Sequence, residues 1–280
     1  MKYLLAAIDI DGTLSNSNKE LSGFTVSTII KAQKLGLRVV IASGRPTRGL
    51  AYYADLLQIY DYGGYVMAYN GGQVTEWATG NILYTKAVTE EGIRKAVELA
   101  RKTKTTIIAY SDKEILTETP DDEYIPRLSR NNRMPIVGVD DFLQTALSMN
   151  PAPVKLLLSC PTENIDERVT IFKKELKNQM DVFRSADTFI ELVPKGIDKG
   201  YALSVLAKHL NIHPDQIVAF GDESNDISML RFVGLGVAVI NATEPAKAAA
   251  DLITKSNNED GVAHVLDTMI LNQLEHYDTN

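Results

Sequence analysis

Short apolar runs alternate with amphipathic segments along the first part of the chain. The runs have the near-continuous hydrophobicity of strands that are buried on both faces of a parallel sheet. Between the first two runs, apolar side chains in residues 22–35 recur at roughly helical spacing, with Ser22 as a candidate N-cap and Gly36 as a stop signal. The predicted strands are residues 3–9, 37–43 and 64–70.

The same alternation returns near the C-terminus. We expect a helix over residues 199–210, followed by three short apolar runs. These runs, the predicted late strands, are residues 217–220, 234–240 and 250–256. Strands that alternate with helices form a mostly parallel sheet with helices on both faces. The pattern therefore predicts an α/β fold.

Residues from about 83 to 189 interrupt this alternation. The segment carries a helical stretch at 89–103, an acidic stretch and a basic stretch, and its strand candidates outnumber regular strand–helix units. Such a pattern is typical of a separate α+β module. We therefore expect a domain over residues 83–189, inserted into a core made of residues 1–82 and 190–280.

Composition narrows the functional classes. The chain has 280 residues, 45% of them hydrophobic, so it can bury at least one full core. Its formal net charge of −7 offers no basic surface for a nucleic-acid backbone, and no apolar run approaches the ~18 residues of a membrane span. The single cysteine, Cys160, excludes an internal disulfide and suits a reducing compartment. We expect a cytoplasmic protein that binds neither nucleic acid nor membranes.

Polar side chains follow the predicted strands, and ligands of open parallel sheets bind beyond the carboxyl ends of the strands. Several carboxylates brought together are costly unless a cation neutralises them. Oxygen ligands of this kind suit Mg²⁺, while a hydroxyl and glycine amides suit phosphate oxygens. The strand ends supply Asp9, Asp11 and Thr13, then Ser43, Gly44 and Arg45, then Asn70, Gly71 and Gly72, and finally Asp222, Glu223, Asn225 and Asp226. This set indicates phosphoryl transfer assisted by Mg²⁺.

The pair Asp9 and Asp11 suits the two chemical roles of such a reaction. An aspartate carboxylate can attack phosphorus and form an aspartyl-phosphate, which water later cleaves. Like charges held close together have their pKa values pushed apart, so one carboxylate can stay ionised while the other carries a proton. Residues two apart on a strand point to the same side. We therefore predict Asp9 as the nucleophile and Asp11 as the general acid and base.

Four motifs, in order, carry a family resemblance. They are "DIDGT" from Asp9, the Ser43 of "IASGR", the Lys199 of "GIDKG", and "GDESND" around Asp222. Together they resemble the motifs of the haloacid dehalogenase superfamily of phosphohydrolases. The large insert between the second and third motifs resembles the C2-type cap of the Cof-like subfamily. The stretch "YNGG" at residues 69–72 strengthens the resemblance to this subfamily. The resemblance implies a three-layer, Rossmann-like core, an α/β cap, and Mg²⁺-dependent hydrolysis of small phosphorylated metabolites.

The resemblance also implies a role for each matching residue. Mg²⁺ would be held by Asp9, Asp222 and the backbone carbonyl of Asp11, and Asp226 would support Lys199 or the metal's waters. The phosphoryl group would be held by Ser43, Lys199 and Asn225, with Gly44 and Arg45 lining the pocket. The cap would close over the site and select the substrate.

Three basic residues outside the motif positions leave alternatives open. Lys195 competes with Lys199 for the phosphate role, but Lys199 lies at the motif position and at a predicted helix start. Arg127 and Arg130, in the basic stretch of the insert, either contact an anionic leaving group or belong to a solvated helix face.

Other functions share parts of this pattern, since "DGT" alone is a common turn and Ser43 alone is an ordinary helix cap. A phosphomutase would pass the phosphoryl group to a sugar, but no second phosphate clamp stands out in the sequence. A phospho-acceptor signalling module also uses Asp, hydroxyl and Lys at strand ends, yet needs neither Asp11 nor so large an insert. A regulatory protein that keeps the site only for binding would not turn over. We predict a phosphatase, whose substrate the fold alone does not name.

Overall fold

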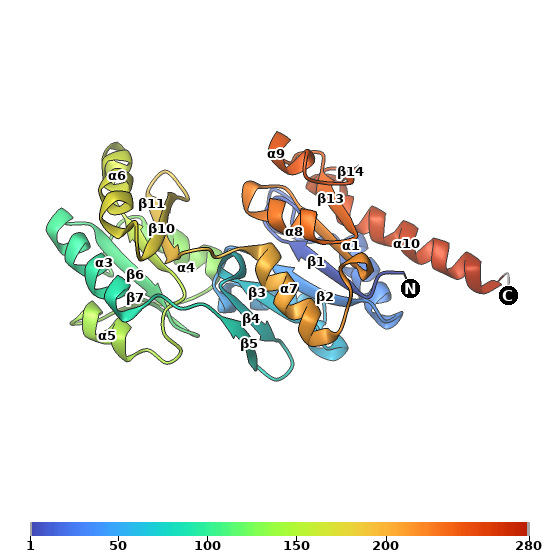
Figure 1. The fold of residues 1–280 in the computed structure, drawn as a ribbon, viewed down its shortest axis with the longest axis horizontal. Helices are drawn as coiled ribbons and strands as arrows, with labels where there is room; N and C mark the ends of the chain where they lie inside the picture. Colours follow the sequence, from blue (N-terminus) through green and yellow to red (C-terminus); the bar gives the residue numbers. More distant parts are fainter. Residues whose placement is uncertain (1, 279–280) are drawn as a thin grey trace. The chain divides into compact units, whose positions relative to one another are not determined.

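The structure, a computed structural model, describes residues 2–278 and the side chains of residues 2–269. The chain forms two compact units, each with its own sheet (Figure 1). The first unit runs up to Gly44, resumes at Leu50–Tyr84 and continues from Asp198 onward. The second consists of Arg45–Gly49 and Thr85–Ile197.

The first unit is built on an eight-stranded sheet in the order β14-β13-β12-β1-β2-β3-β4-β5. Neighbouring strands from β14 to β3 are parallel, and β4 runs antiparallel to β3. The strands are β1 (Leu5–Asp9), β2 (Arg38–Ala42), β3 (Tyr65–Ala68), β4 (Gln73–Glu76), β5 (Ile82–Thr85), β12 (Ile217–Gly221), β13 (Leu235–Val239) and β14 (Leu252–Thr254). The carboxyl end of β1, at Asp9, therefore lies between the carboxyl ends of β2 and β12.

Helices cover both faces of this sheet. Leu203 and Met229, from two of these helices, share a buried cluster with Ala7 of β1. Ala6 and Ile8 alternate with Ala7 along β1, so they point to the opposite face of the sheet, and they are also buried. The helices α1 and α10 pack against each other, and none of their described residues belongs to the cluster of the first face. The helices of the unit are α1 (Gly23–Lys34), α2 (Ala51–Leu56), α7 (Lys199–Leu210), α8 (Ile227–Phe232), α9 (Glu244–Lys247) and α10 (Gly261–Asp278). The predicted α/β class with a mostly parallel sheet is confirmed.

Local sequence accounts for the two helices that the chain pattern predicts most clearly. The side chain of Ser22 accepts a hydrogen bond from the amide of Thr25 and so caps α1. Asp198 caps α7 in the same way, by accepting from the amide of Tyr201. Both helices form where the sequence predicts them, and each predicted strand forms within its expected range except β12, which extends one residue further, to Gly221.

The second unit has a six-stranded sheet in the order β10-β11-β9-β6-β7-β8. Its neighbours are antiparallel except for β7 and β8. Side chains of α3, α5 and α6, including Phe142 and Phe172, form a buried cluster with one face of this sheet. The elements are α3 (Glu90–Thr103), β6 (Thr106–Tyr110), β7 (Ile115–Thr117), α4 (Ile125–Asn132), β8 (Ile136–Gly138), α5 (Phe142–Ser148), β9 (Leu156–Ser159), α6 (Ile165–Leu176), β10 (Met180–Arg184) and β11 (Phe189–Pro194).

The second unit continues past residue 189, where the sequence places the end of the insert. β11 pairs with both β9 and β10, so this strand is part of the second sheet and the unit runs on to Ile197. The unit also includes Arg45–Gly49, which follows β2 in the chain. The pairing of β11 with β9 and β10 therefore sets the end of the second unit, and the hydrophobic pattern of the sequence does not predict this pairing.

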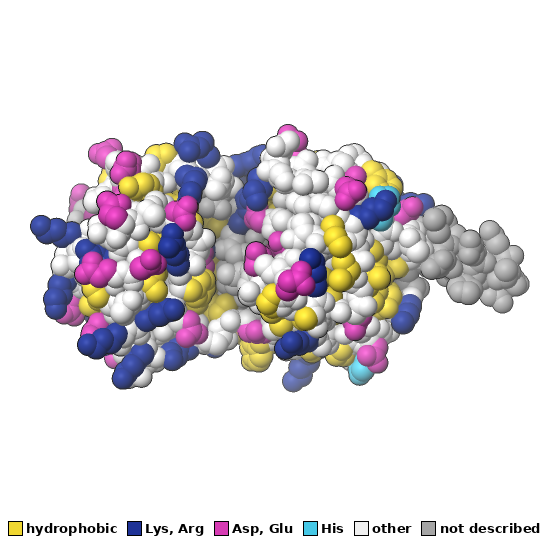
Figure 2. All heavy atoms as spheres, turned by 90° about the horizontal axis from the view of Figure 1, so that it is seen from above, with side chains coloured by type: hydrophobic (Ala, Val, Ile, Leu, Met, Phe, Trp, Pro, Cys, Tyr) yellow, Lys and Arg dark blue, Asp and Glu magenta, His cyan; other side chains and the backbone are white. Residues whose placement is uncertain are grey.

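The surface carries charges of both signs. Figure 2 shows acidic and basic side chains interspersed over the drawn face. Within the part of the chain that the structure describes, no helix has the length and apolar character that crossing a membrane requires.

Candidate active site

The buried ammonium of Lys199 is the centre of the site. It donates to Oδ1 of Asp9 over 2.7 Å, to Oδ1 of Asp226 over 2.6 Å and to the carbonyl of Ala42 over 3.2 Å. Its side chain is 0% exposed, so the protein itself uses the three hydrogens of the ammonium. Lys199 begins α7, whereas Asp9 ends β1, so two distant elements meet at this ion pair.

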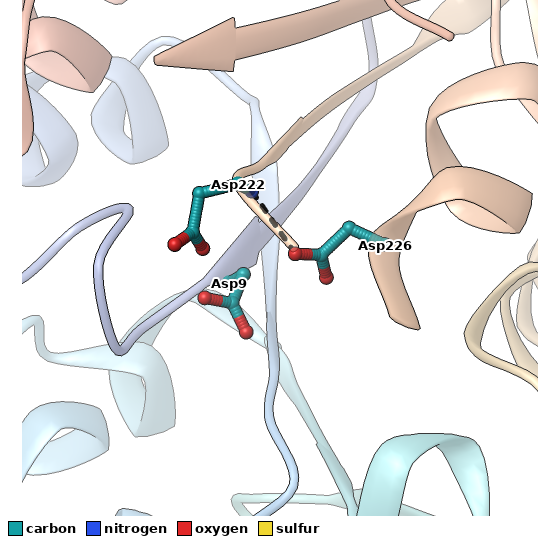
Figure 3. A group of neighbouring side chains, drawn as sticks. All are labelled: Asp9, Asp222 and Asp226. Carbon is teal, nitrogen blue, oxygen red and sulfur yellow. Dashed lines mark hydrogen bonds between the residues drawn. The ribbon is translucent and has the colours of Figure 1, made fainter. Parts of the chain in front are cut away.

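Asp222 adds a third carboxylate to this cluster. One oxygen from each of Asp9, Asp222 and Asp226 lies within 4.8 Å of the others, and Figure 3 shows the three carboxylates gathered together. Asp222 accepts a hydrogen bond of 2.7 Å from the buried hydroxyl of Thr13. Asp226 uses its second oxygen to accept from the backbone amides of Asp222 and Glu223, at 3.0 Å each. Asp226 is therefore held by the protein on both oxygens.

The cluster holds more negative than positive charge. Burial raises the pKa of Asp9 well above its usual range, and the carboxylates of Asp226 and Asp222 add to this, although Lys199 opposes it. Burial likewise raises the pKa of Asp222 to about 6, despite the hydrogen bond from Thr13. Burial lowers the pKa of Lys199, but Asp226 and Asp9 outweigh that effect and leave it above the ordinary value. Neighbouring carboxylates contribute an upward shift to all three pKa values, so they favour a bound proton or cation in the cluster.

Gly12 leaves room for the third carboxylate. Its φ is +89°, a conformation that other residues rarely adopt, and a Cβ built on it would collide with Oδ2 of Asp222. The turn after β1 therefore passes directly beside Asp222. A larger residue at position 12 would displace either the turn or this carboxylate.

Asp11, the predicted acid and base, has a surface environment different from that of Asp9. Its side chain is 33% exposed, and the ammonium of Lys19 lies 2.8 Å from its Oδ1. Lys19 has a positive φ of 64°, and its carbonyl accepts a hydrogen bond from the hydroxyl of Tyr53. The loop after β1 thus places the ammonium of Lys19 beside the carboxylate of Asp11.

Two asparagines from the C-terminal part of the chain hold the same loop. Asn241 donates from its side chain to the carbonyl of Gly12 over 2.8 Å, and Asn257 donates to the carbonyl of Ser15 over 2.8 Å. The backbone amide of Asn257 also donates to the side chain of Asn241. No pattern in the sequence connects these residues with the loop, because the contacts span more than half of the chain.

The predicted phosphate-binding residues fall into two groups. Ser43 and Gly44, at the end of β2, and Asn225, before α8, belong to the first unit together with Lys199. Arg45 belongs to the second unit, where its guanidinium donates to the carbonyl of Asn131 over 2.6 Å. The role predicted for Arg45 toward phosphate stays a prediction.

The basic residues left open by the sequence differ in burial. Lys195 is exposed and belongs to the second unit, whereas Lys199 is buried against Asp9, which favours Lys199 as the residue of the site. Arg127 and Arg130 lie on α4 and are exposed, and the guanidinium carbon of Arg127 lies 4.9 Å from the centre of the Phe189 ring. Their contact with substrate stays a prediction.

Two residues named only as strand-end residues in the sequence have specific contacts. Thr13 binds Asp222, and Asn70 accepts a 2.8 Å hydrogen bond from the side-chain amide of Asn225. The sequence signal for both is their place just past a predicted strand. Nothing local indicates that their partners lie near residue 220.

Comparison with known proteins identifies the family. The model of the haloacid dehalogenase-like hydrolases matches residues 6–266. The crystal structure of a haloacid dehalogenase-like hydrolase from Bacteroides thetaiotaomicron resembles this chain with a TM-score of 0.91 and 38% identity, covering 95% of this chain and 99% of that one. TM0651 from Thermotoga maritima gives a TM-score of 0.86 and 31% identity, over 95% and 97% of the two chains.

A relative with a named reaction is similar over almost its whole length. The 5-amino-6-(5-phospho-D-ribitylamino)uracil phosphatase YwtE of Bacillus subtilis is 30% identical over 292 residues, which cover 95% of this chain and 98% of YwtE. Together with the family model and the similar structures, this relative is sufficient to assign the chain to a protein family. The chain belongs to the haloacid dehalogenase-like hydrolases and is an enzyme of that family, as its four motifs predict.

Proposed function

We propose that this enzyme is a Mg²⁺-dependent phosphatase that releases phosphate from small phosphorylated metabolites through an aspartyl-phosphate on Asp9. The observation that carries the proposal is the buried cluster of Asp9, Asp222 and Asp226 around Lys199 at the carboxyl ends of β1 and β12. Relatives such as YwtE, whose name is that of a phosphatase, support the same class of reaction.

The donor set fits Mg²⁺. Asp226 is occupied by Lys199 and by backbone amides, so we assign the metal to one carboxylate oxygen each from Asp9 and Asp222 and to the backbone carbonyl of Asp11. Bound there, Mg²⁺ would neutralise the excess negative charge of the cluster and polarise the phosphoryl group. Burial raises the pKa values of Asp9 and Asp222, and neighbouring carboxylates add to the effect, which a bound cation would oppose.

The first half of the reaction uses both aspartates of the "DIDGT" motif. A carboxylate oxygen of Asp9 attacks phosphorus, and the bond from phosphorus to the leaving oxygen breaks. Asp11 gives its proton to that leaving oxygen, which departs as an alcohol. The products of this half are the alcohol, the aspartyl-phosphate on Asp9 and an ionised Asp11 beside Lys19.

The second half restores the enzyme. Asp11 takes a proton from a water molecule, whose oxygen attacks phosphorus, and the bond between phosphorus and Asp9 breaks. Inorganic phosphate leaves, Asp9 is a carboxylate again, and Asp11 is again protonated. The ion pair of Asp11 with Lys19 suits the ionised form that this half requires.

The phosphoryl oxygens require positive charge and hydrogen-bond donors. We propose that these come from Lys199 as a buried charge, the Ser43 hydroxyl, the Asn225 amide, and the Gly44–Arg45 segment. When Asp9 becomes an acyl phosphate, it loses its negative charge, and the hydrogen of Lys199 that it held becomes available to a phosphoryl oxygen. The cluster would thus exchange one anion for another.

The second unit is the proposed cap, which would exclude water and select the leaving group. We propose Arg127 and Arg130, both exposed on α4, as contacts for an anionic leaving group. We propose sugar phosphates and similar small phosphorylated metabolites as the substrate class.

The test is a screen of the purified enzyme with Mg²⁺ against phosphorylated metabolites, with phosphate release as the measurement. Asp9→Asn is the blank, and activity is expected to fall at least about a thousandfold because the nucleophile is lost. The exposed Asp61→Asn is the matched control and should retain wild-type rates. Removal of divalent cations with a chelator should also stop turnover. Activity that survives Asp9→Asn would refute the proposal.

A further inference from the structure

A strained turn lies between the segments that carry the proposed phosphate ligands. After β3 the chain makes a single turn over Tyr69–Gly71, in which Tyr69, Asn70 and Gly71 have φ angles of 54°, 57° and 92°. Positive φ is unfavourable for residues with a side chain, above all for a tyrosine. Such a conformation persists only where surrounding contacts maintain it, which makes those contacts informative.

Asn70 first fixes the end of β2. Its backbone amide donates to the carbonyl of Ser43 over 2.9 Å. Its side chain lies against Gly44, where an added Cβ would be 3.0 Å from Oδ1 of Asn70. The backbone after β2 is therefore held on two sides by one residue.

Asn70 also holds the side chain of Asn225. Oδ1 of Asn70 accepts a hydrogen bond of 2.8 Å from Nδ2 of Asn225. Asn225 is exposed, so without this bond its amide would rotate among several orientations. Because the two residues are 155 positions apart, the bond also ties the end of β3 to the segment after β12.

The next residue of the turn touches a third ligand segment. A Cβ on Gly71 would lie 2.6 Å from the carbonyl of Asp198 and 3.0 Å from Cα of Lys199. The backbone of the turn is thus packed against the start of α7. One turn thereby contacts the segments of Ser43, Asn225 and Lys199.

We propose that Asn70 is a positioning residue of the phosphate-binding site: it orients the amide of Asn225 and holds the Ser43–Gly44 backbone for a phosphoryl group. This inference rests on the proposed phosphatase function. It adds that the site depends on a residue outside the four motifs, and that Asn70 acts mainly through Asn225.

The experiment compares Asn70→Gly, Asn225→Ala and the double variant. Glycine tolerates the positive φ of residue 70, so the substitution removes the side chain and leaves the backbone. Asn211→Gly is the matched control, because Asn211 also has a positive φ, of 53°, and lies exposed at the end of α7. The measurements are the inhibition constant of inorganic phosphate and kcat and KM for p-nitrophenyl phosphate.

We expect Asn70→Gly to raise the inhibition constant of phosphate and KM about 3- to 10-fold, the effect of one lost hydrogen bond, with a smaller change in kcat. In the Asn225→Ala background, Asn70→Gly should have little further effect. Asn211→Gly should match the wild type. An equal effect of Asn70→Gly in both backgrounds, or no effect in either, would overturn the proposal.

A second measurement needs no substrate and therefore separates this inference from the proposed function. In ¹⁵N-labelled protein, the side-chain amide signals of Asn225 are assigned by their absence from Asn225→Ala. They should shift in Asn70→Gly and stay in place in Asn211→Gly. Unmoved Asn225 signals would overturn the positioning role, whereas turnover that survives Asp9→Asn would overturn only the phosphatase proposal.

Discussion

Replacing Lys199 by methionine tests how the buried charges of the site are balanced. Methionine is of similar length but removes the ammonium, so Asp9 and Asp226 lose the cation that lies 2.7 and 2.6 Å from their oxygens. Their side chains are only 7% and 1% exposed, so water does not replace it. Removing one partner of a buried ion pair costs about 3–5 kcal/mol. We expect a fall of that size in the free energy of unfolding.

The assay is urea unfolding followed by circular dichroism, with Lys195→Met as the matched control. Lys195 is exposed and lies four residues earlier in the chain, so its replacement should change stability by no more than about 0.5 kcal/mol. Phosphate release by Lys199→Met should also fall by about a hundredfold or more, because a positive group that faces the developing charge is lost.

A double variant separates charge from packing. Lys199→Met with Asp226→Asn removes one of the two uncompensated carboxylates and should recover part of the lost stability, but none of the activity. Equal urea midpoints for Lys199→Met and Lys195→Met would refute the reasoning, since they would mean that the ammonium does not offset the buried carboxylates.

Two further predictions concern the surroundings of Asp222. Thr13→Val removes the hydrogen bond to Asp222 and should weaken Mg²⁺ binding about 10- to 100-fold, measured as a smaller rise in melting temperature on adding Mg²⁺. Thr75→Val is the control, because the buried hydroxyl of Thr75 has no hydrogen-bond partner among the described residues; an equal Mg²⁺ effect in both variants would contradict the assignment. Gly12→Ala and Gly36→Ala both place alanine at positive φ, at a strain of about 1–3 kcal/mol, but only the former also collides with Asp222. Gly12→Ala should therefore show the larger loss of thermal stability and the weaker Mg²⁺ response; similar values for the two would show that no close approach exists at position 12.

Local patterns in the sequence predict the core of the fold. The apolar run that ends at Asp9 forms β1, and the helices capped by Ser22 and Asp198 form where expected. These features depend on residues close together in the chain, namely the hydrophobic period and one side chain that satisfies helix amides. The family resemblance follows from four short motifs for the same reason.

Local patterns in the sequence do not predict where the second unit ends, at Ile197. β11 begins at Phe189 and runs to Pro194, although the sequence predicts a return to the core from residue 190; the strand pairs with β9 and β10. An apolar strand has the same pattern in either sheet. Which sheet it joins depends on partners that lie elsewhere in the chain.

The sequence by itself determined the class of chemistry, because the residues at the ends of parallel strands must meet at one edge of the sheet. Only the tertiary structure decided how those residues share charge and hydrogen bonds. It buried Lys199 and left Lys195 exposed, paired Thr13 with Asp222 across 209 positions, and joined Asn70 to Asn225. Burial and side-chain contact are properties of long-range packing, which local hydrophobic periodicity does not encode.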